Sequence, residues 1–228
     1  MKKNLSIIVP FYNEANSIIK VIDEINQLNL EKQIIAINDG SNDLNNNQKN
    51  IIKNKVDIYL ENKINKGKGY SVINAISHCK EGFIIVKDAD LEYDPLDIQR
   101  IYNFAVNKNK NIVYGSRFLK KYSYKKTLFY FGNMFFTNLF NILYKQNITD
   151  AHTCYKLFYK SLLDNIDLTS KRFELCAEMN AKFAKKKFEI CEIPINYNPR
   201  SKKEGKKIGL RDAIITLITY VKYLFINY

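Results

Sequence analysis

The segment FIIVKDADLEYDP, residues 83–95, begins as a short apolar run and continues directly into three carboxylates at alternating positions, Asp88, Asp90 and Glu92. An apolar run of this length, bounded by turn residues, is typical of a buried β-strand. Mg²⁺ and Mn²⁺ prefer hard oxygen ligands and usually take only one or two protein carboxylates, which leaves coordination positions for substrate phosphates. Crowded carboxylates also raise one another's pKa unless a cation relieves them. The segment therefore predicts a strand that ends in a divalent-metal and phosphate site, with a solvated acidic turn as the alternative.

Four other β-rich runs recur along the chain with helical patterns between them, at residues 5–9, 34–37, 56–59 and 112–115. Between the first two, residues 14–27 place isoleucine and valine at helical spacing. Strands that alternate with helices predict βαβ units, and so an α/β fold with a mostly parallel central sheet flanked by helices. Ligands of such sheets bind beyond the carboxyl ends of the strands, which is where candidates for chemistry belong.

Polar clusters follow three of these strands. They are Pro10, Tyr12, Asn13 and Glu14 after the first, Asn38, Asp39, Gly40 and Ser41 after the second, and Asp88, Asp90 and Glu92 after the fourth. The carboxyl ends of parallel strands meet at one edge of the sheet, so we expect a single site there. The sequence NKGKG at residues 65–69 precedes another helical pattern. Free backbone amides and the helix dipole make such a place an anion site, with an exposed loop as the alternative.

The composition indicates a single folded domain and an anionic partner. With 228 residues, 46% of them hydrophobic, we expect a single domain over residues 1–228. The net charge of +13 favours nucleic acid, phospholipid or a phosphorylated substrate. Four widely spaced cysteines and two histidines predict reduced, cytoplasmic thiols rather than a zinc site or a disulfide framework. The first apolar run is too short for the core of a signal peptide, so export by that route is not expected.

Two apolar stretches, residues 128–144 and 208–228, approach the length of about 20 residues that a membrane span needs. A glycine and three asparagines interrupt the first, and Arg211, Asp212 and Lys222 interrupt the second. Neither pattern predicts a transmembrane helix. Both fit helices in the bilayer interface with basic flanks on the headgroups, or helices packed in the core.

Taken in order, the motifs resemble those of a known family. VPFYNE (9–14), NDGSND (38–43), NKGKGYSV (65–72), KDADLEYDP (87–95) and YGSRF (114–118) resemble the family 2 glycosyltransferases with a GT-A fold. ITDAHTCYKLF (148–158), RFELCAEMNAKFAKK (172–186) and EIPINYNPRSKKEGKKIGLRDA (192–213) resemble the dolichyl-phosphate mannose synthase branch, particularly its bacterial polyprenyl-phosphate members. The resemblance covers residues 5–222. It implies a Rossmann-like GT-A domain with amphipathic interfacial helices.

The resemblance also implies roles for single residues. Those expected to bind the nucleotide sugar are Pro10, Tyr12, Glu14, Asp39, Lys66, Asp88 and Asp90. Asp90 and Glu92 would hold the metal. Arg117, Arg200 and Lys206 would bind the phosphates of the donor or the acceptor, and the catalytic set would be Asp90, Arg117 and Asp150.

The activity implied is an inverting transfer of a hexose, mannose or glucose, from a GDP- or UDP-sugar to dolichyl or undecaprenyl phosphate, with Mg²⁺ or Mn²⁺ as cofactor. A phosphate monoester has a second pKa of about 6 and is largely dianionic at neutral pH, so such an acceptor needs no general base. Residues 119–147 would form an interfacial acceptor segment and residues 208–228 a C-terminal amphipathic helix. The enzyme would lie peripherally on the inner face of the membrane, alone or with a separate membrane-protein partner.

The sequence departs from the family pattern at two places. Asn38 replaces the first aspartate of the usual DDGS, which is expected to alter a hydrogen bond to the base or ribose. Residues 125–138 lack the arginine that follows GSR as a second acceptor-phosphate clamp, and Lys125 or Lys126 would substitute only as point charges.

The alternative activity is that of a family 2 enzyme acting on a sugar hydroxyl in surface polysaccharide synthesis. A hydroxyl acceptor needs a base, and Asp150 would be the candidate. Nucleic-acid binding is not expected, because the sequence has no recognition helix, RNP-like motif or zinc finger.

Overall fold

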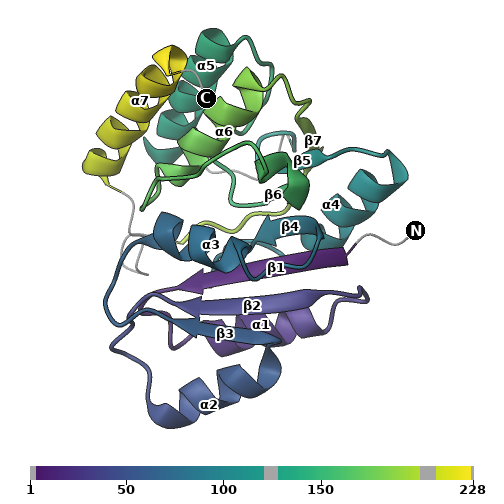
Figure 1. Cartoon of the computed structure of the whole chain (residues 1–228), viewed down its shortest axis with the longest axis vertical. Coiled ribbons are helices and arrows are strands. Elements are labelled where there is room, and N and C mark those ends of the chain that lie inside the picture. The colour runs from purple at the N-terminus through teal and green to yellow at the C-terminus, as the bar shows by residue number, and fades with distance from the viewer. Residues whose placement is uncertain (1–3, 121–127, 201–208, 227–228) are drawn as a thin grey trace.

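The computed structural model describes residues 4–120, 128–200 and 209–226. Its described part contains one seven-stranded sheet in the order β3-β2-β1-β4-β6-β5-β7 (Figure 1). The strands are β1 (Asn4–Phe11), β2 (Gln33–Asn38), β3 (Ile58–Glu61), β4 (Gly82–Val86), β5 (Ile112–Ser116), β6 (Lys156–Tyr159) and β7 (Cys191–Pro194). β6 runs antiparallel to both β4 and β5, and the other paired strands are parallel. The predicted α/β fold with a mostly parallel sheet is therefore confirmed.

Helices cover both faces of the sheet. They are α1 (Ile18–Asn26), α2 (Asn46–Lys55), α3 (Lys68–Ile76), α4 (Leu96–Asn107), α5 (Leu128–Tyr144), α6 (Leu175–Lys185) and α7 (Leu210–Phe225), with a short 3₁₀ turn at Lys160–Leu163. Successive strand residues point to opposite faces, so Ile7 and Val9 of β1 join the core beneath α1 and α4, whereas Ile8 joins the core beneath α3, α5 and α6. α5, α6 and α7 gather at the end of the molecule opposite α2 (Figure 1).

The first helix begins later than the periodicity of residues 14–27 indicates, because the chain after β1 is tied to the next strand end. Asn13 has a positive φ of 51°. Its backbone N–H donates to Ser41 Oγ at 3.0 Å, and the Ala15 N–H donates to Asp43 Oδ2 at 2.9 Å. These hydrogen bonds hold the segment in turns until Ile18, and they fix the two strand ends relative to each other.

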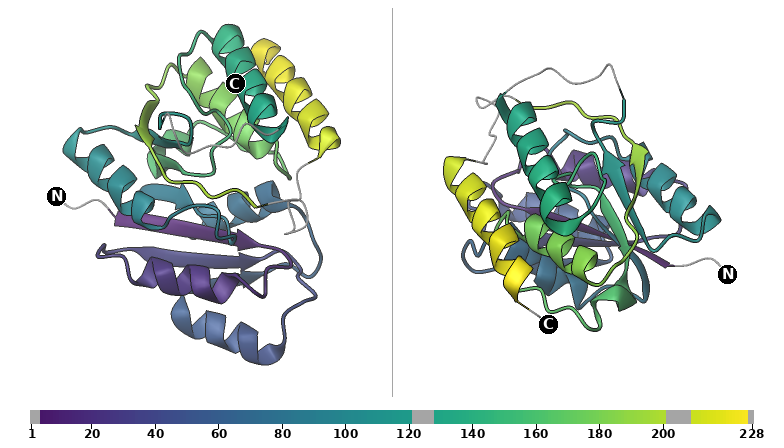
Figure 2. Two further views of the ribbon diagram at one scale, coloured as in Figure 1. Left: turned by 180° about the vertical axis from the view of Figure 1, so that it is seen from behind. Right: turned by 90° about the horizontal axis from the view of Figure 1, so that it is seen from above.

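The two long helices near the C-terminus share a buried seam. Phe140 of α5 is fully buried and lies 5.5 Å, between ring centroids, from Tyr220 of α7. Tyr144 Oη donates to the Tyr220 carbonyl at 2.7 Å. Figure 2 shows α5 and α7 side by side. This part of the predicted interfacial segment 119–147 therefore has one face in the core.

α7 is amphipathic, but its hydroxyl-bearing face is buried and its apolar face is exposed. Its four buried residues are Thr216, Thr219, Tyr220 and Tyr223, all of which carry a hydroxyl group. Its exposed residues include Leu210, Ile214, Leu217, Ile218, Val221 and Phe225. The apolar stripe therefore faces outward, where water would disfavour it. In the part of the chain that the structure describes, no helix is both long and apolar enough to cross a bilayer.

We predict opposite outcomes for two phenylalanines of α5. Phe140→Ala removes a fully buried ring and should lower the free energy of unfolding by about 3–5 kcal/mol. Phe135 is 59% exposed, so Phe135→Ala should change it by less than about 0.5 kcal/mol. Urea unfolding followed by circular dichroism measures both values, and equal destabilisation would contradict the placement of this helix.

Candidate active site

The candidate site lies beyond the carboxyl ends of β1, β2, β4 and β5. β1 and β2 pair up to Phe11 and Asn38, so the residues that follow them lie next to each other. β4 pairs with β1 up to Val86, which brings the acidic segment after it to the same edge. The polar clusters predicted to converge are thus brought together by strand register.

Asp39 organises the loop of residues 65–69, here called the Gly67 loop. Its carboxylate is buried and accepts hydrogen bonds from the backbone N–H groups of Lys66 and Gly67, at 2.9 and 2.8 Å, and from Asn62 Nδ2 at 2.7 Å. Gly67 has a φ of 97°, a conformation that favours glycine. The predicted nucleotide-binding Asp39 therefore acts locally on the shape of the loop at the N-terminus of α3.

Other residues predicted to bind the nucleotide lie at the same edge of the sheet. Pro10 is buried in β1, and Tyr12 is partly exposed just beyond the strand. The Lys66 ammonium lies 3.1 Å from Tyr70 Oη and 4.5 Å from the centre of its ring. Asn38, which departs from the family pattern, donates to Glu61 Oε1 at 3.1 Å. An aspartate at position 38 would place a second carboxylate against Glu61. Repulsion between the two carboxylates explains why an asparagine suits this position.

Two lysines stabilise the acidic turn after β4. Lys68 Nζ lies 2.5 Å from Asp88 Oδ1. Burial disfavours the charged form of Asp88, but the ion pair with Lys68 outweighs it and lowers the pKa of Asp88. Lys87 is fully buried and donates to the carbonyls of Asp88 and Asp90 at 2.9 and 2.8 Å. Lys87 therefore stabilises the turn through its backbone carbonyls, and Lys68 stabilises it through the side chain of Asp88.

Arg200 brings three more carboxylates together. Its guanidinium lies 3.1 Å from Glu14 Oε2 and 3.2 Å from Asp90 Oδ2, and its Nε lies 3.8 Å from Glu92 Oε1. Burial and the neighbouring charges of Asp88 and Glu92 raise the pKa of Asp90 to about 6. A single arginine thus offsets only part of the negative charge of this cluster.

The donor set fits a divalent cation shared with a ligand. Asp90 and Glu92 offer hard carboxylate oxygens, and the three carboxylates beside Arg200 outnumber its single positive charge. In residues 4–120, 128–200 and 209–226, no group of three or more acidic, histidine or cysteine side chains is placed to hold a metal by itself. Asp90 and Glu92 would therefore hold an ion whose remaining ligands are water and substrate phosphates.

Arg117 and Asp150 form a second, deeper cluster. Arg117 Nε and Nη2 donate to the two Asp150 oxygens at 2.7 and 2.8 Å, and the Arg117 N–H donates at 3.0 Å. Both side chains are buried. Burial acts to raise the pKa of Asp150, but Arg117 lowers it below the usual range. Glu192 accepts from the Asp150 N–H at 2.9 Å and so fixes the backbone beneath the pair.

Tyr197 connects the two clusters and was not singled out from the sequence. Its hydroxyl donates to Glu92 Oε2 at 2.6 Å, and the Arg117 guanidinium lies 5.1 Å from the centre of its ring. Lys68 and Lys87 were also not proposed as site residues, although both lie inside motifs that were. Lys206, a predicted phosphate-binding residue, lies outside the described residues.

A comparison with solved structures identifies the fold. The chain superposes on the crystal structure of glucosyl-3-phosphoglycerate synthase from Mycobacterium tuberculosis with a TM-score of 0.73 and 13% identity, covering 99% of this chain and 81% of that one. The fold is therefore the GT-A-like α/β fold, as the sequence predicted.

The family follows from the sequence comparison. The model of glycosyl transferase family 2 matches residues 6–167, and the chain belongs to that family. It is 30% identical to the UDP-N-acetylglucosamine–dolichyl-phosphate N-acetylglucosaminyltransferase of Methanococcus voltae, over 96% of each chain. It is 26% identical to the low-salt glycan biosynthesis hexosyltransferase Agl6 of Haloferax volcanii, over 97% of this chain and 55% of that protein. The chain thus spans about half the length of the second relative.

We predict strong coupling between Arg117 and Asp150. Asp150→Asn leaves a buried guanidinium without its counter-charge and should lower the free energy of unfolding by about 3–5 kcal/mol. The double variant Arg117→Gln/Asp150→Asn should be less destabilised than the sum of the two single variants, because neither buried charge remains. Urea unfolding of all four proteins measures the coupling, and additivity within about 0.5 kcal/mol would speak against the buried pair.

Proposed function

We propose that this enzyme transfers a hexose from a nucleoside-diphosphate sugar to a polyprenyl phosphate, with inversion at the anomeric carbon, at the cytoplasmic face of the membrane. The observation that carries the choice of acceptor is the state of Asp150. Its carboxylate is buried, paired twice with Arg117, and has a lowered pKa. Such a group is a poor general base, and a dianionic phosphate is the acceptor that requires none.

The names of several relatives support the same acceptor. The Methanococcus voltae protein is named for transfer to dolichyl phosphate, and a Haloferax volcanii relative, 24% identical over 87% of this chain, is named dolichyl-phosphate hexose transferase. The Mycobacterium tuberculosis structure was determined with Mn²⁺ and UDP. These names favour UDP-sugars as the first donors to test, with GDP-sugars as the second.

The chain's own residues account for the chemistry in three parts. Lys66 and Lys68 of the Gly67 loop would bind the nucleoside-diphosphate donor, and Arg200 would supply positive charge where the two phosphates approach each other. Arg117, held in place by Asp150, would face the acceptor phosphate. An acceptor oxygen attacks the anomeric carbon from the face opposite the diphosphate, so that one C–O bond forms as the other breaks and the nucleoside diphosphate departs. A divalent ion held by Asp90 and Glu92 would neutralise the departing charge.

Turnover with lipid phosphate tests the proposal. Purified protein with labelled UDP- or GDP-hexose, Mn²⁺ or Mg²⁺, and undecaprenyl or dolichyl phosphate should form a lipid-linked sugar, and a chelator should abolish it. Asp90→Asn should lower the rate at least about 100-fold without unfolding the protein. The exposed Asp164→Asn serves as the control and should retain the rate. Absence of a lipid-linked product from every donor, or transfer to a glycan hydroxyl with indifference to lipid phosphate, would contradict the proposal.

We further propose that the outward faces of α5 and α7 lie in the bilayer interface. Phe131, Phe135 and Ile142 of α5 are exposed, as is the apolar stripe of α7. The net charge of +13 adds attraction to anionic headgroups. An acceptor with its chain in the bilayer would then reach the site from the side on which these helices lie.

Matched charge substitutions test this contact. Ile218 on α7 is 58% exposed and Leu96 on α4 is 61% exposed, so both can be replaced without disturbing the core. Ile218→Glu should reduce binding to anionic vesicles several-fold, because it places a carboxylate in the apolar stripe, whereas Leu96→Glu should leave binding unchanged. Vesicle co-sedimentation measures both, and equal effects would argue against the assigned face.

A further inference from the structure

Glu178 of α6 is a fully buried carboxylate that the proposed reaction does not use. Its relative exposure is 0%. It accepts hydrogen bonds from the backbone N–H groups of Thr169 and Ser170 at 3.0 and 2.7 Å, from Lys182 Nζ at 2.7 Å and from Tyr223 Oη at 2.7 Å. Burial opposes ionisation, but these hydrogen bonds lower the pKa of Glu178 to about 2. The group is charged at neutral pH, and two backbone amides share its charge.

Those amides belong to residues 168–172, here called the support loop, which lies against the first turn of α3. The Tyr70 N–H donates to the Lys171 carbonyl at 2.9 Å. A Cβ added to Gly69 would come within 2.5 Å of the Ser170 carbonyl, so no side chain fits between the two backbones. The support loop thus touches the end of the Gly67 loop directly, and a shift of one displaces the other.

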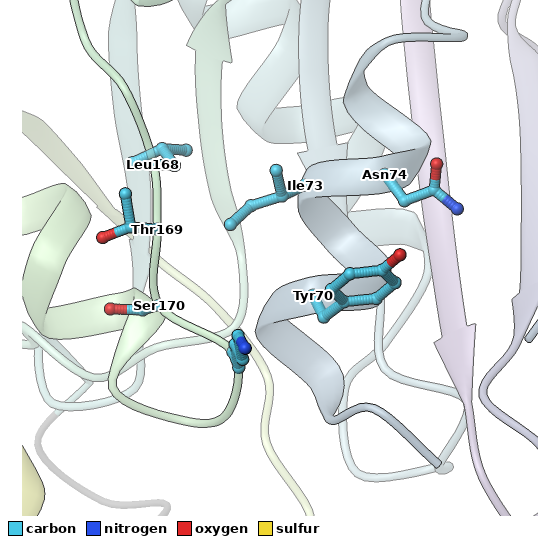
Figure 3. A pocket seen from close by; sticks show the side chains of 7 residues that line it. Tyr70, Ile73, Asn74, Leu168, Thr169 and Ser170 are labelled. Atoms are coloured by element: carbon cyan, nitrogen blue, oxygen red, sulfur yellow. The ribbon is translucent and has the colours of Figure 1, made fainter. Parts of the chain in front are cut away.

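Farther along α3, side chains do not close the gap. A cavity of about 230 Å³ separates the helix from the support loop (Figure 3). Its walls are Tyr70, Ile73 and Asn74 on α3 and Leu168, Thr169, Ser170 and Lys171 on the loop. This pocket is partly open to solvent, so side-chain packing along this stretch does not fix its two walls relative to each other. The position of the support loop therefore depends on its backbone contacts with Gly69 and Tyr70 and on its hydrogen bonds to Glu178 of α6.

We propose that Glu178 is a positioning residue for the nucleoside-diphosphate donor. It holds the support loop against the first turn of α3 and thereby fixes the Gly67 loop, whose Lys66 is expected to bind the nucleotide. Asp39 clamps the same loop from the opposite side through the N–H groups of Lys66 and Gly67. The inference rests on the proposed function, since it takes the Gly67 loop as part of the site of the nucleoside-diphosphate donor.

The Tyr223 hydroxyl extends this anchor to α7. It reaches Glu178 directly and lies 3.2 Å from Thr169 Oγ1. Tyr144 supplies a matched comparison, because its buried hydroxyl also joins the α7 packing but binds the Tyr220 carbonyl instead. Removing the Tyr144 hydroxyl costs its hydrogen bond to the Tyr220 carbonyl, whereas removing the Tyr223 hydroxyl costs its hydrogen bonds to Glu178 and to Thr169 of the support loop.

The experiment measures nucleotide affinity separately from stability. UDP and GDP are titrated with Mn²⁺ into the wild type, Glu178→Gln, Tyr223→Phe and Tyr144→Phe by calorimetry, and KM is measured for donor and acceptor. Glu178→Gln should raise the Kd of the nucleotide and the donor KM about tenfold, with the acceptor KM unchanged. Tyr223→Phe should weaken donor binding in the same sense by a smaller factor. Tyr144→Phe should lower Tm without changing the Kd.

Each outcome bears on the inference in a definite way. Equal nucleotide affinity in the wild type, Glu178→Gln and Tyr223→Phe, or an equal loss in Tyr144→Phe, overturns the positioning role and leaves the proposed function intact. A wild type that binds neither nucleotide overturns both. If Glu178→Gln does not fold, Tyr223→Phe and Thr169→Ala decide the question. Each removes one hydroxyl group that donates a hydrogen bond to the Glu178 carboxylate.

Discussion

The crowding of carboxylates beyond β1 and β4 is the constraint on which the rest of the site depends. Glu14, Asp88, Asp90 and Glu92 all lie at this edge, and a cluster of like charges cannot stay ionised without cations beside it. The cations come from distant parts of the chain: Lys68 from the start of α3 and Arg200 from beyond β7. The acidic turn therefore holds the Gly67 loop and the segment after β7 in place as much as they hold it.

The buried ion pair of Arg117 and Asp150 differs from the Asp90 cluster in net charge. Arg117 and Asp150 match each other charge for charge, with bidentate geometry and no exposed oxygen to spare. The carboxylates of the Asp90 cluster outnumber the positive charge of Arg200, and burial together with the charges of Asp88 and Glu92 raises the pKa of Asp90. The neutral ion pair suits a structural role in the site, and the negatively charged cluster suits the binding of a metal ion together with a phosphate.

The C-terminal helices extend this organisation to the outer surface. α7 turns hydroxyl-bearing side chains inward, and one of them, Tyr223, binds the carboxylate that anchors the support loop. Its apolar side chains remain outside. One helix thus carries the apolar surface that we propose to lie in the bilayer interface and a hydroxyl group of the network that supports the Gly67 loop.

The sequence by itself determined the alternation of strands and helices, the family, and the edge at which the carboxylates gather, because strand periodicity and motif order are local properties. It did not indicate β6 and β7, because Lys156 and Glu192 interrupt the short apolar runs of these strands. It placed Arg117 and Asp150 near substrate without indicating that they bind each other. Only the tertiary structure decided the ion pairs, since Arg200 and Asp90 lie 110 residues apart. It likewise decided the inverted face of α7 and the role of Glu178, because contacts of this range depend on how the connections cross the sheet and not on local pattern.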